Sequence, residues 1–275
     1  MQVTVCELPS QPDAVEAAWR ALCAHTARVQ PDLVVLPEFA WVEPVWESPT
    51  FDPARWGAAV AQTDAWMQRL PELKAACVVG ARPVTDRGRP LNEGFAWTPA
   101  GGTRRLRRKF HLPDEPGGWE ARWWDRGDPA FPVFDVAGHA MGLNICTELW
   151  ALDTLAGYAH QGVQAILTPR AAAAATTGKW LSLGTVAAVR SGAFSISSNR
   201  VDDRDCYGGT GWIIDPDGLL MARTSAEQPF CTAEVDLSAP HRARHTYPRY
   251  VFEAPACSSA QPTQAPLSSH PHAHD

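Results

Sequence analysis

The sequence lacks the features of a membrane, secreted or zinc-ribbon protein. No apolar run among its 275 residues approaches the roughly 20 residues that span a bilayer. The opening MQVTVCELPSQPD contains neither a basic leader nor an apolar signal segment. The seven cysteines are odd in number and include no CxxC pair, so neither a zinc ribbon nor a paired disulfide framework is indicated. We therefore expect a cytosolic protein with no membrane partner.

Dense positive charge is also scarce. The formal net charge is -6, and the only dense basic run, RRLRRK (104–109), has no interleaved aromatic residues. Nucleic acid is therefore not an expected partner. With 45% hydrophobic residues, the chain can bury the core of one large α/β domain or of two small ones.

Extended and amphipathic segments alternate along the chain, which is typical of an α/β fold. The first half predicts strands at 3–5, 33–38 and 76–84, helices near 12–29 and 54–70, and a hairpin of 92–99 with 103–110. The second half predicts a hairpin of 131–136 with 140–146, helices near 148–160 and 179–191, strands at 165–170 and 194–200, and a strong turn at 215–218. The similarity of the two halves indicates two packed sheets.

No Pro- or Gly-rich linker separates the halves, so we assign residues 1–253 to one domain. Residues 254–275 are rich in Pro, Ser and Ala and have little to bury, which predicts a mobile tail or one that wraps a partner. His270, His272 and His274 could bind a metal there, although a solvated low-complexity end is the interpretation that we favour.

Three polar residues each follow an extended segment. Glu38 ends LVVLPE, Lys109 ends RRLRRK, and Cys146 lies where the apolar GLNIC meets a helical pattern. At the carboxyl end of a strand and beside a helix N-terminus, exposed N–H groups and the helix dipole favour a thiolate. Glu, Lys and Cys together suggest acyl chemistry on a C–N bond.

Six segments occur in an order and spacing that are typical of one family: LPEF (36–39), RKFHL (108–112), WEARWWDRGD (119–128), GLNICTE (142–148), SSNR (197–200) and GWIIDPDG (211–218). On these segments the chain resembles the nitrilase, or carbon-nitrogen hydrolase, superfamily over about residues 3–238. The resemblance implies an α+β fold, a four-layer αββα sandwich, and a cysteine hydrolase that uses no metal and no organic cofactor. It also maps a catalytic set onto Glu38, Lys109 and Cys146.

The chemistry of these residue types agrees with that mapping. A thiol with an ordinary pKa of about 8.5 is only slightly ionised at neutral pH, so Glu38 would act as the base that takes its proton. Lys109 and the backbone N–H of Thr147 would stabilise the oxyanion that forms when the thiol attacks a carbonyl. Glu38 would then protonate the departing amine and activate the water that hydrolyses the thioester.

The resemblance also implies a second carboxylate that orients the lysine. The segment WEARWWDRGD assigns it to Glu120, with Glu115 as the alternative. Glu148 is expected to anchor the start of its helix, and His111 is expected to be structural rather than the base of a Cys–His pair. Replacement of Arg107 by Lys, in the same basic run as Lys109, is expected to be nearly silent.

Two further residues are candidates for substrate contacts. Trp119, with the two tryptophans that follow it, could wall an apolar pocket or plug a domain edge. Arg170 could hold a substrate carboxylate in bidentate fashion, but a salt bridge to Glu148 or Glu120 is the alternative that we favour.

The leading hypothesis is an amidohydrolase that releases ammonia or an amine from a small carboxamide or ureido compound. Nitrile hydrolysis to acid and ammonia is the alternative. A catalytically idle interaction protein is disfavoured because the whole catalytic set is kept, and a redox sensor would need a resolving thiol such as Cys206 near Cys146. The resemblance further implies a homodimer packed through the helices near 148–160 and 179–191, which carry few charges.

Overall fold

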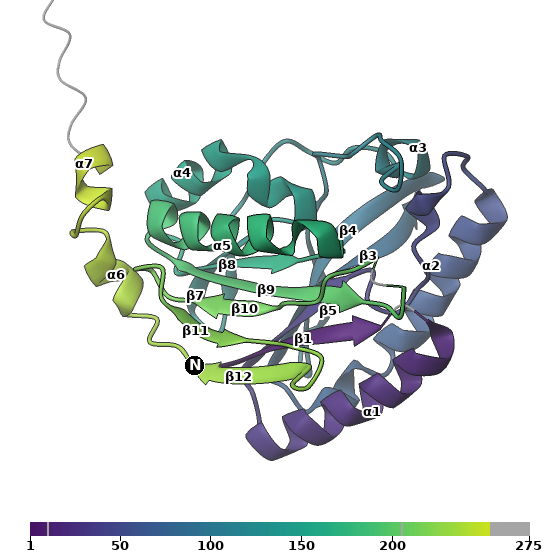
Figure 1. Cartoon of the computed structure of the whole chain (residues 1–275), viewed down its shortest axis with the longest axis horizontal. Coiled ribbons are helices and arrows are strands. Elements are labelled where there is room, and N and C mark those ends of the chain that lie inside the picture. Colours follow the sequence, from purple (N-terminus) through teal and green to yellow (C-terminus); the bar gives the residue numbers. More distant parts are fainter. Residues whose placement is uncertain (10, 205, 254–275) are drawn as a thin grey trace, which may run out of the picture.

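The computed structural model describes residues 1–9, 11–204 and 206–253 (Figure 1). The tail predicted at 254–275, with His270, His272 and His274, lies outside these residues. None of the described helices is both long and apolar enough to cross a membrane.

Strands and helices alternate in both halves of the chain. The first half contains β1 (Gln2–Pro9), α1 (Pro12–Val29), β2 (Leu33–Glu38), α2 (Pro53–Met67), β3 (Cys77–Asp86), β4 (Arg89–Thr98), β5 (Gly102–Arg108) and the short α3 (Glu120–Trp123). The second half contains β6 (Phe134–Val136), β7 (His139–Leu143), α4 (Leu152–His160), β8 (Ala165–Pro169), α5 (Thr177–Ser191), β9 (Phe194–Val201), β10 (Trp212–Ile214), β11 (Leu220–Arg223), β12 (Phe230–Glu234), α6 (Ala239–Ala243) and α7 (Arg249–Glu253).

The strands form two sheets that are joined at one place. The first has the order β5-β4-β3-β2-β1-β12, with β1, β2 and β3 parallel to one another. The second has the order β6-β7-β8-β9-β10-β11, with β7, β8 and β9 parallel. Near its carboxyl end β1 also pairs in parallel with β9, which places residues 7–9 opposite residues 199–201. This pairing joins the two halves of the chain.

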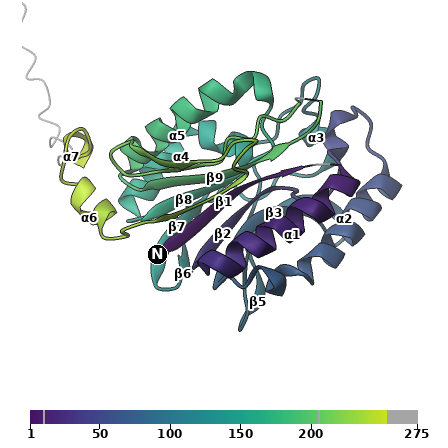
Figure 2. The ribbon, with the colours of Figure 1, turned by 60° about the horizontal axis from the view of Figure 1, so that its bottom comes forward.

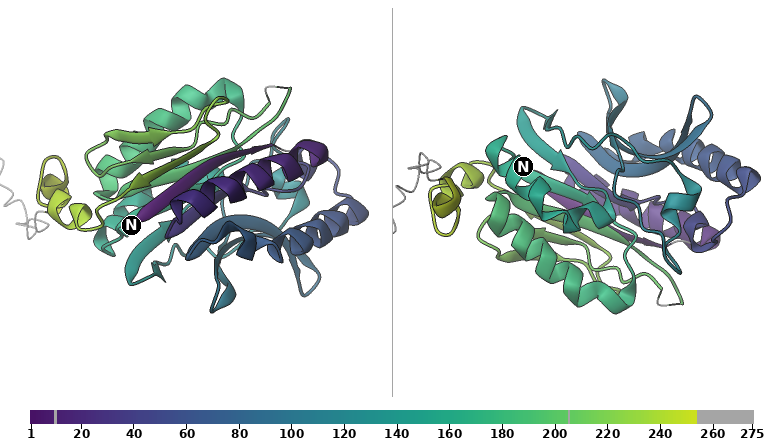
Figure 3. Two further views of the ribbon diagram at one scale, coloured as in Figure 1. Left: turned by 90° about the horizontal axis from the view of Figure 1, so that it is seen from below. Right: turned by 90° about the horizontal axis from the view of Figure 1, so that it is seen from above.

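Side chains of the central strands alternate between an inner core and two outer cores. In β2, Leu33 and Val35 lie in the core between the sheets, whereas Val34 and Leu36 pack with the core under α1. Strand β8 alternates in the same way between the inner core and the core under α4 and α5. Figure 2 shows α4 and α5 on one side of the strands and α1 and α2 on the other, and Figure 3 shows these layers from below and from above. The predicted four-layer αββα sandwich is confirmed.

Two features differ from the sequence-based expectation. The strand predicted to reach Cys146 ends at Leu143, and a 3₁₀ turn (Cys146–Trp150) precedes α4, which starts at Leu152. Strand β12 was not predicted either, because its five residues, FCTAE, carry little alternation and its partner β1 lies at the other end of the chain.

Gly94 of β4 provides a test of how closely the sheets pack. A methyl group added there would lie 2.2 Å from Cδ2 of Leu143, a fully buried side chain of the other sheet. We expect Gly94→Ala to lower the free energy of unfolding by about 1–3 kcal/mol, measured by chemical denaturation, because a close-packed core resists extra atoms. The control is Gly57→Ala in α2, where the added methyl group meets nothing within 4 Å, and it should not destabilise. Equal stability of the two variants would contradict this packing.

Candidate active site

The three residues predicted as a catalytic set all lie where strands end. Glu38 is the last residue of β2, Lys109 follows β5, and Cys146 opens the 3₁₀ turn after β7. Pro37 has no N–H to give to the sheet, and the pairing of β2 with β3 shifts register before Glu38. The N–H of Glu38 instead donates to the carbonyl of Arg170, 3.2 Å away. The end of β2 is thereby tied to the segment after β8.

Lys109 is fully buried and lies between two carboxylates. Its Nζ donates to Oε1 of Glu38 at 2.8 Å and to Oε1 of Glu120 at 2.8 Å. Asn92 of β4 also donates to Oε1 of Glu38, at 2.7 Å. Asn92 was not predicted, and the available signal was a polar residue within a strand that is otherwise rich in apolar residues. Because an ammonium group carries three N–H donors, one remains for a ligand.

Burial and charge act on this cluster in opposite directions. Burial disfavours the ammonium of Lys109, but the negative charges of Glu120 and Glu38 raise the pKa of Lys109 above its ordinary value. Burial also raises the pKa of Glu120, with Lys109 opposing the shift and Glu38 adding to it. The two carboxylates therefore keep Lys109 protonated, while burial makes the carboxyl of Glu120 easier to protonate than that of an ordinary glutamate.

Cys146 adopts a backbone conformation that residues other than glycine rarely take, with φ of 48°. Burial raises the pKa of its thiol to about 12, and the charge of Glu38 adds to the shift. Lys109 and a hydrogen bond from the backbone N–H of Ala171 oppose it. Burial and the nearby carboxylate thus oppose the thiolate that the helix dipole favours, which agrees with the expectation that a base must take the thiol proton.

A buried ion pair braces the turn that carries Cys146. Nη2 of Arg107 donates to Oε1 of Glu148 at 3.0 Å, and Nη1 donates to Oε2. Glu148 also accepts from the N–H of Ile145 at 2.9 Å and from that of Phe110 at 2.7 Å. The anchoring role expected of Glu148 agrees with these contacts. Arg107, whose replacement by Lys was expected to be nearly silent, is buried and binds Glu148, which points to a structural role for this side chain.

Burial distinguishes the two candidates for the second carboxylate. Glu115 is exposed in the loop before α3, whereas Glu120 is buried against Lys109. His111 packs against two phenylalanine rings, which agrees with a structural role. Thr147 is the second residue of the 3₁₀ turn. The first backbone N–H groups of a helical turn have no acceptor within that turn, so they can donate to other groups.

Arg170 makes neither of the predicted salt bridges. Its Nε donates to Oγ of Ser197 at 2.7 Å, and its Nη2 donates to the carbonyl of Thr210 at 2.6 Å. The guanidinium lies 4.0 Å from the centre of a tryptophan ring in β10. The favoured salt bridge to Glu148 or Glu120 is wrong, because other cations bind those two carboxylates.

Aromatic residues fill the space next to the end of β2. One buried cluster contains Phe39, Val42, Val45, Trp46, Trp56, Ala59, Trp123, Trp124 and Tyr207. Trp119 is half-buried and packs against this cluster. Trp123 and Trp124 are buried members of the cluster, which agrees with the expectation that they plug the domain edge. Arg200 donates to the carbonyls of Phe39 and Val42 and fixes the chain after Glu38. Arg200 was not predicted, although the SSNR segment contains it.

The remaining sequence-based candidates gain no support from the structure. Cys206 is an exposed free thiol whose sulfur contacts the carbonyl of Arg204, and Cys146 is a buried free thiol. Over residues 1–9, 11–204 and 206–253, no group of three or more His, Cys, Asp or Glu side chains is arranged to hold a metal ion.

The sequence model of the carbon-nitrogen hydrolase family matches residues 2–244. The chain therefore belongs to this family. An N-carbamoylputrescine amidase from Solanum lycopersicum is 26% identical over 163 residues, which cover 53% of this chain and 54% of that protein, so the chain spans only about half of its length. An omega-amidase from Bos taurus is 28% identical over 195 residues, which cover 66% of this chain and 70% of that protein.

A solved structure shares the fold. The crystal structure of a carbon-nitrogen hydrolase from Helicobacter pylori G27 has a TM-score of 0.77 and 18% sequence identity to this chain. The similarity covers 91% of this chain and 94% of that one.

Arg107→Leu should lower the free energy of unfolding by about 3–5 kcal/mol, because it leaves Glu148 as a buried charge without a partner. Chemical denaturation measures the change. Arg105→Leu is the matched control on the same strand, since Arg105 is exposed, and it should change stability by no more than about 0.5 kcal/mol. Similar losses at both positions would contradict a specific role for the Arg107–Glu148 pair.

Glu38→Gln should lower the pKa of Cys146, because the charge of Glu38 opposes the thiolate. At any pH below about 12, more of the thiol is then ionised, so iodoacetamide should alkylate Cys146 faster than in the parent protein. Peptide mass spectrometry as a function of pH measures this rate. Glu115→Gln, which removes an exposed charge, should leave the rate unchanged. An unchanged rate in Glu38→Gln would show that Glu38 does not act on the thiol, and a slower rate would show that its role as a base outweighs the effect of its charge on the pKa.

Proposed function

We propose that this protein is a cysteine-dependent amidase that hydrolyses a small carboxamide or ureido substrate through a thioester. The observation that carries the proposal is that Lys109 donates hydrogen bonds to both Glu38 and Glu120. These three residues also lie close enough to the Cys146 thiol to interact with it electrostatically. A base, a fixed cation and a nucleophile are the groups that acyl transfer from nitrogen requires. The amidase names of the two relatives support this choice of substrate class.

In the first half of the reaction, Cys146 attacks the carbonyl carbon while Glu38 takes the thiol proton. Oε1 of Glu38 receives the hydrogen bonds from Lys109 and Asn92, which leaves Oε2 to accept that proton. The carbonyl oxygen becomes an oxyanion, stabilised by the third N–H of Lys109 and the backbone N–H of Thr147. The C–N bond then breaks, and the proton held by Glu38 passes to the departing nitrogen.

In the second half, water replaces the amine. Glu38, again unprotonated, takes one proton from a water molecule as its oxygen attacks the thioester carbon. The same two donors stabilise the second oxyanion. The C–S bond breaks, the carboxylic acid leaves, and the proton returns to the sulfur, which restores the starting site. Glu120 contributes by holding Lys109 in place.

Arg170 and Trp119 are the proposed substrate contacts. Burial lowers the pKa of Arg170 to about 9, and the charges of Cys146 and Glu7 oppose the shift, so the guanidinium is near the thiol and still charged at neutral pH. Among the described residues no carboxylate forms a salt bridge with Arg170, which favours a substrate that carries a carboxylate. Trp119 lies at the margin of the aromatic cluster, where a half-buried ring can cover an apolar part of the substrate.

Mass spectrometry of the intact protein tests the proposed reaction. Incubation with a panel of amides and nitriles should add one acyl group to the wild type, and peptide mapping should place it on Cys146. Cys146→Ala should form no adduct and lose ammonia release by about 1,000-fold or more, while Cys23→Ala keeps both. An adduct from nitriles alone would make the protein a nitrilase, and ammonia release by Cys146→Ala at the wild-type rate would refute the mechanism.

We also propose that the protein forms a homodimer through α4, α5 and the turn before α4. Trp150, Leu152 and Val186, on segments that contact one another, are 45%, 50% and 47% exposed, and exposed apolar side chains on neighbouring segments mark interaction sites. Light scattering across a dilution series should give twice the chain mass of 29.9 kDa. Leu152→Glu should shift the protein to the monomer, whereas Leu219→Glu, at an exposed leucine in the β10–β11 turn, should not. A wild type that is monomeric at every concentration would refute this proposal.

A further inference from the structure

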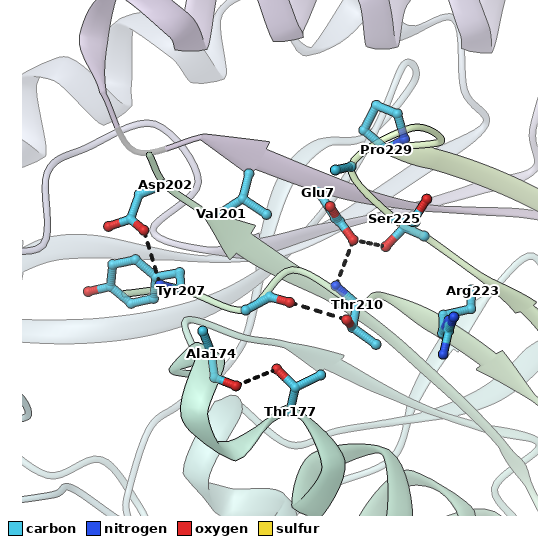
Figure 4. Close-up of a pocket in the computed structure, with 13 residues that line it drawn as sticks. Glu7, Ala174, Thr177, Val201, Asp202, Tyr207, Thr210, Arg223, Ser225 and Pro229 are labelled. Atoms are coloured by element: carbon cyan, nitrogen blue, oxygen red, sulfur yellow. Dashed lines mark hydrogen bonds between the residues drawn. The ribbon is translucent and has the colours of Figure 1, made fainter. Parts of the chain in front are cut away.

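One cavity lies apart from Glu38, Lys109 and Cys146, none of which lines it. Its volume is about 610 Å³, and it lies between the end of β1, the segment after β9 and the β11–β12 turn. Figure 4 shows Glu7 extending into it from β1, with threonine and serine hydroxyl groups around it. Ala226 and Pro229 provide apolar wall on the side of the β11–β12 turn.

Glu7 is a buried carboxylate with one unused oxygen. Only 4% of the residue is exposed. Oε1 accepts hydrogen bonds from the N–H of Thr210 at 2.6 Å and from Oγ1 of Thr224 at 2.6 Å. Among the described residues, Oε2 has neither a hydrogen-bond donor nor a salt-bridge partner. A carboxylate that is largely removed from water is stabilised by donors and cations. Arg170 is a buried cation that interacts electrostatically with Glu7, but it does not donate to Oε2.

The carboxylate of Glu7 lies close to the backbone of Gly209 and Thr210. A side chain at Gly209 would collide with the carboxylate, because a Cβ there would lie 2.6 Å from the carboxyl carbon of Glu7. The next residue, Thr210, has φ of 59°, a strained conformation for a β-branched residue. Glu7 holds its N–H while Arg170 holds its carbonyl. Such strain persists where the surroundings over-determine it, as is common at ligand sites.

We propose that this cavity binds a small organic ligand through a primary ammonium group that donates to Oε2 of Glu7. An ammonium supplies the N–H donor that this oxygen lacks together with a positive charge, and the hydroxyl groups of Thr177 and Ser225 line the same cavity. A metal ion fits less well, because the described residues include no group of three side chains arranged as metal ligands. The site is separate from the proposed catalytic reaction.

Isothermal titration calorimetry with n-butylammonium tests the proposal. The wild type should bind saturably, and Glu7→Gln should weaken binding by about 10-fold or more, the usual worth of a hydrogen bond between charged partners. Glu7→Gln keeps an oxygen acceptor for Thr210 and Thr224, so its fold should be preserved. Ala226→Trp should also weaken binding, because Ala226 is exposed and lines the cavity, and this variant leaves Glu7 intact.

Two control variants test where the ammonium binds, and two control ligands test which of its chemical groups is recognised. Glu234→Gln removes an exposed carboxylate at the far end of β12 and should leave affinity unchanged, as should Cys146→Ala. Tetramethylammonium, which has no N–H, and the neutral n-butanol should both bind at least about 10-fold more weakly. No saturable binding by the wild type, equal affinity in Glu7→Gln, or loss of binding in Cys146→Ala would each overturn the proposal. The last result would instead place the ammonium at the catalytic cluster.

Discussion

A buried ammonium group between two carboxylates is the constraint on which most of the site depends. Moving an ion such as that of Lys109 out of water costs several kcal/mol even after the protein relaxes, and only well-placed opposite charges offset this cost. Lys109 receives those charges from the end of β2 and from α3. The first sheet and the loop that leads to the second must therefore reach their native positions together.

Burial, together with the charges that stabilise Lys109, raises the pKa of the Cys146 thiol. In the proposed reaction this joins attack and proton transfer, because the sulfur becomes a strong nucleophile only as Glu38 removes its proton. Two residues of the candidate site have a backbone in the left-handed region of φ/ψ space. Phe39, directly after Glu38, has φ of 48°, and so does Cys146. Both segments of the candidate site thus turn sharply at the point where a polar side chain must leave its strand.

The sequence predicted the framework of the site well because the relevant signals are local. Apolar strands that stop at Glu38 and near Cys146 can be read without a structure, and the spacing of the aromatic segment favoured Glu120 over Glu115. The partners of arginines could not be read in this way. Strands β4 and β5 shift register between Gly94 and Phe95, so Arg105 is exposed while Arg107, two residues later, is buried.

Long-range pairings were likewise beyond the sequence. The contact of Arg170 with Thr210 depends on how the segment after β9 folds back, and no periodic pattern encodes it. The pKa of the Cys146 thiol also depends on distant parts of the chain. The helix dipole favours a thiolate, whereas burial and a carboxylate from a segment far away in the sequence raise the pKa.

Strand β1 has partners from distant parts of the described chain: β2 along one edge, β12 along the other, and β9 near its carboxyl end. On the ribosome, β1 is therefore made long before two of its three neighbours exist. Pairings of this kind close slowly, because a long intervening loop must be ordered first. An uncovered strand edge is a template for another chain. Productive folding thus depends on protection of the β1 edge during synthesis until β12 arrives to cover it.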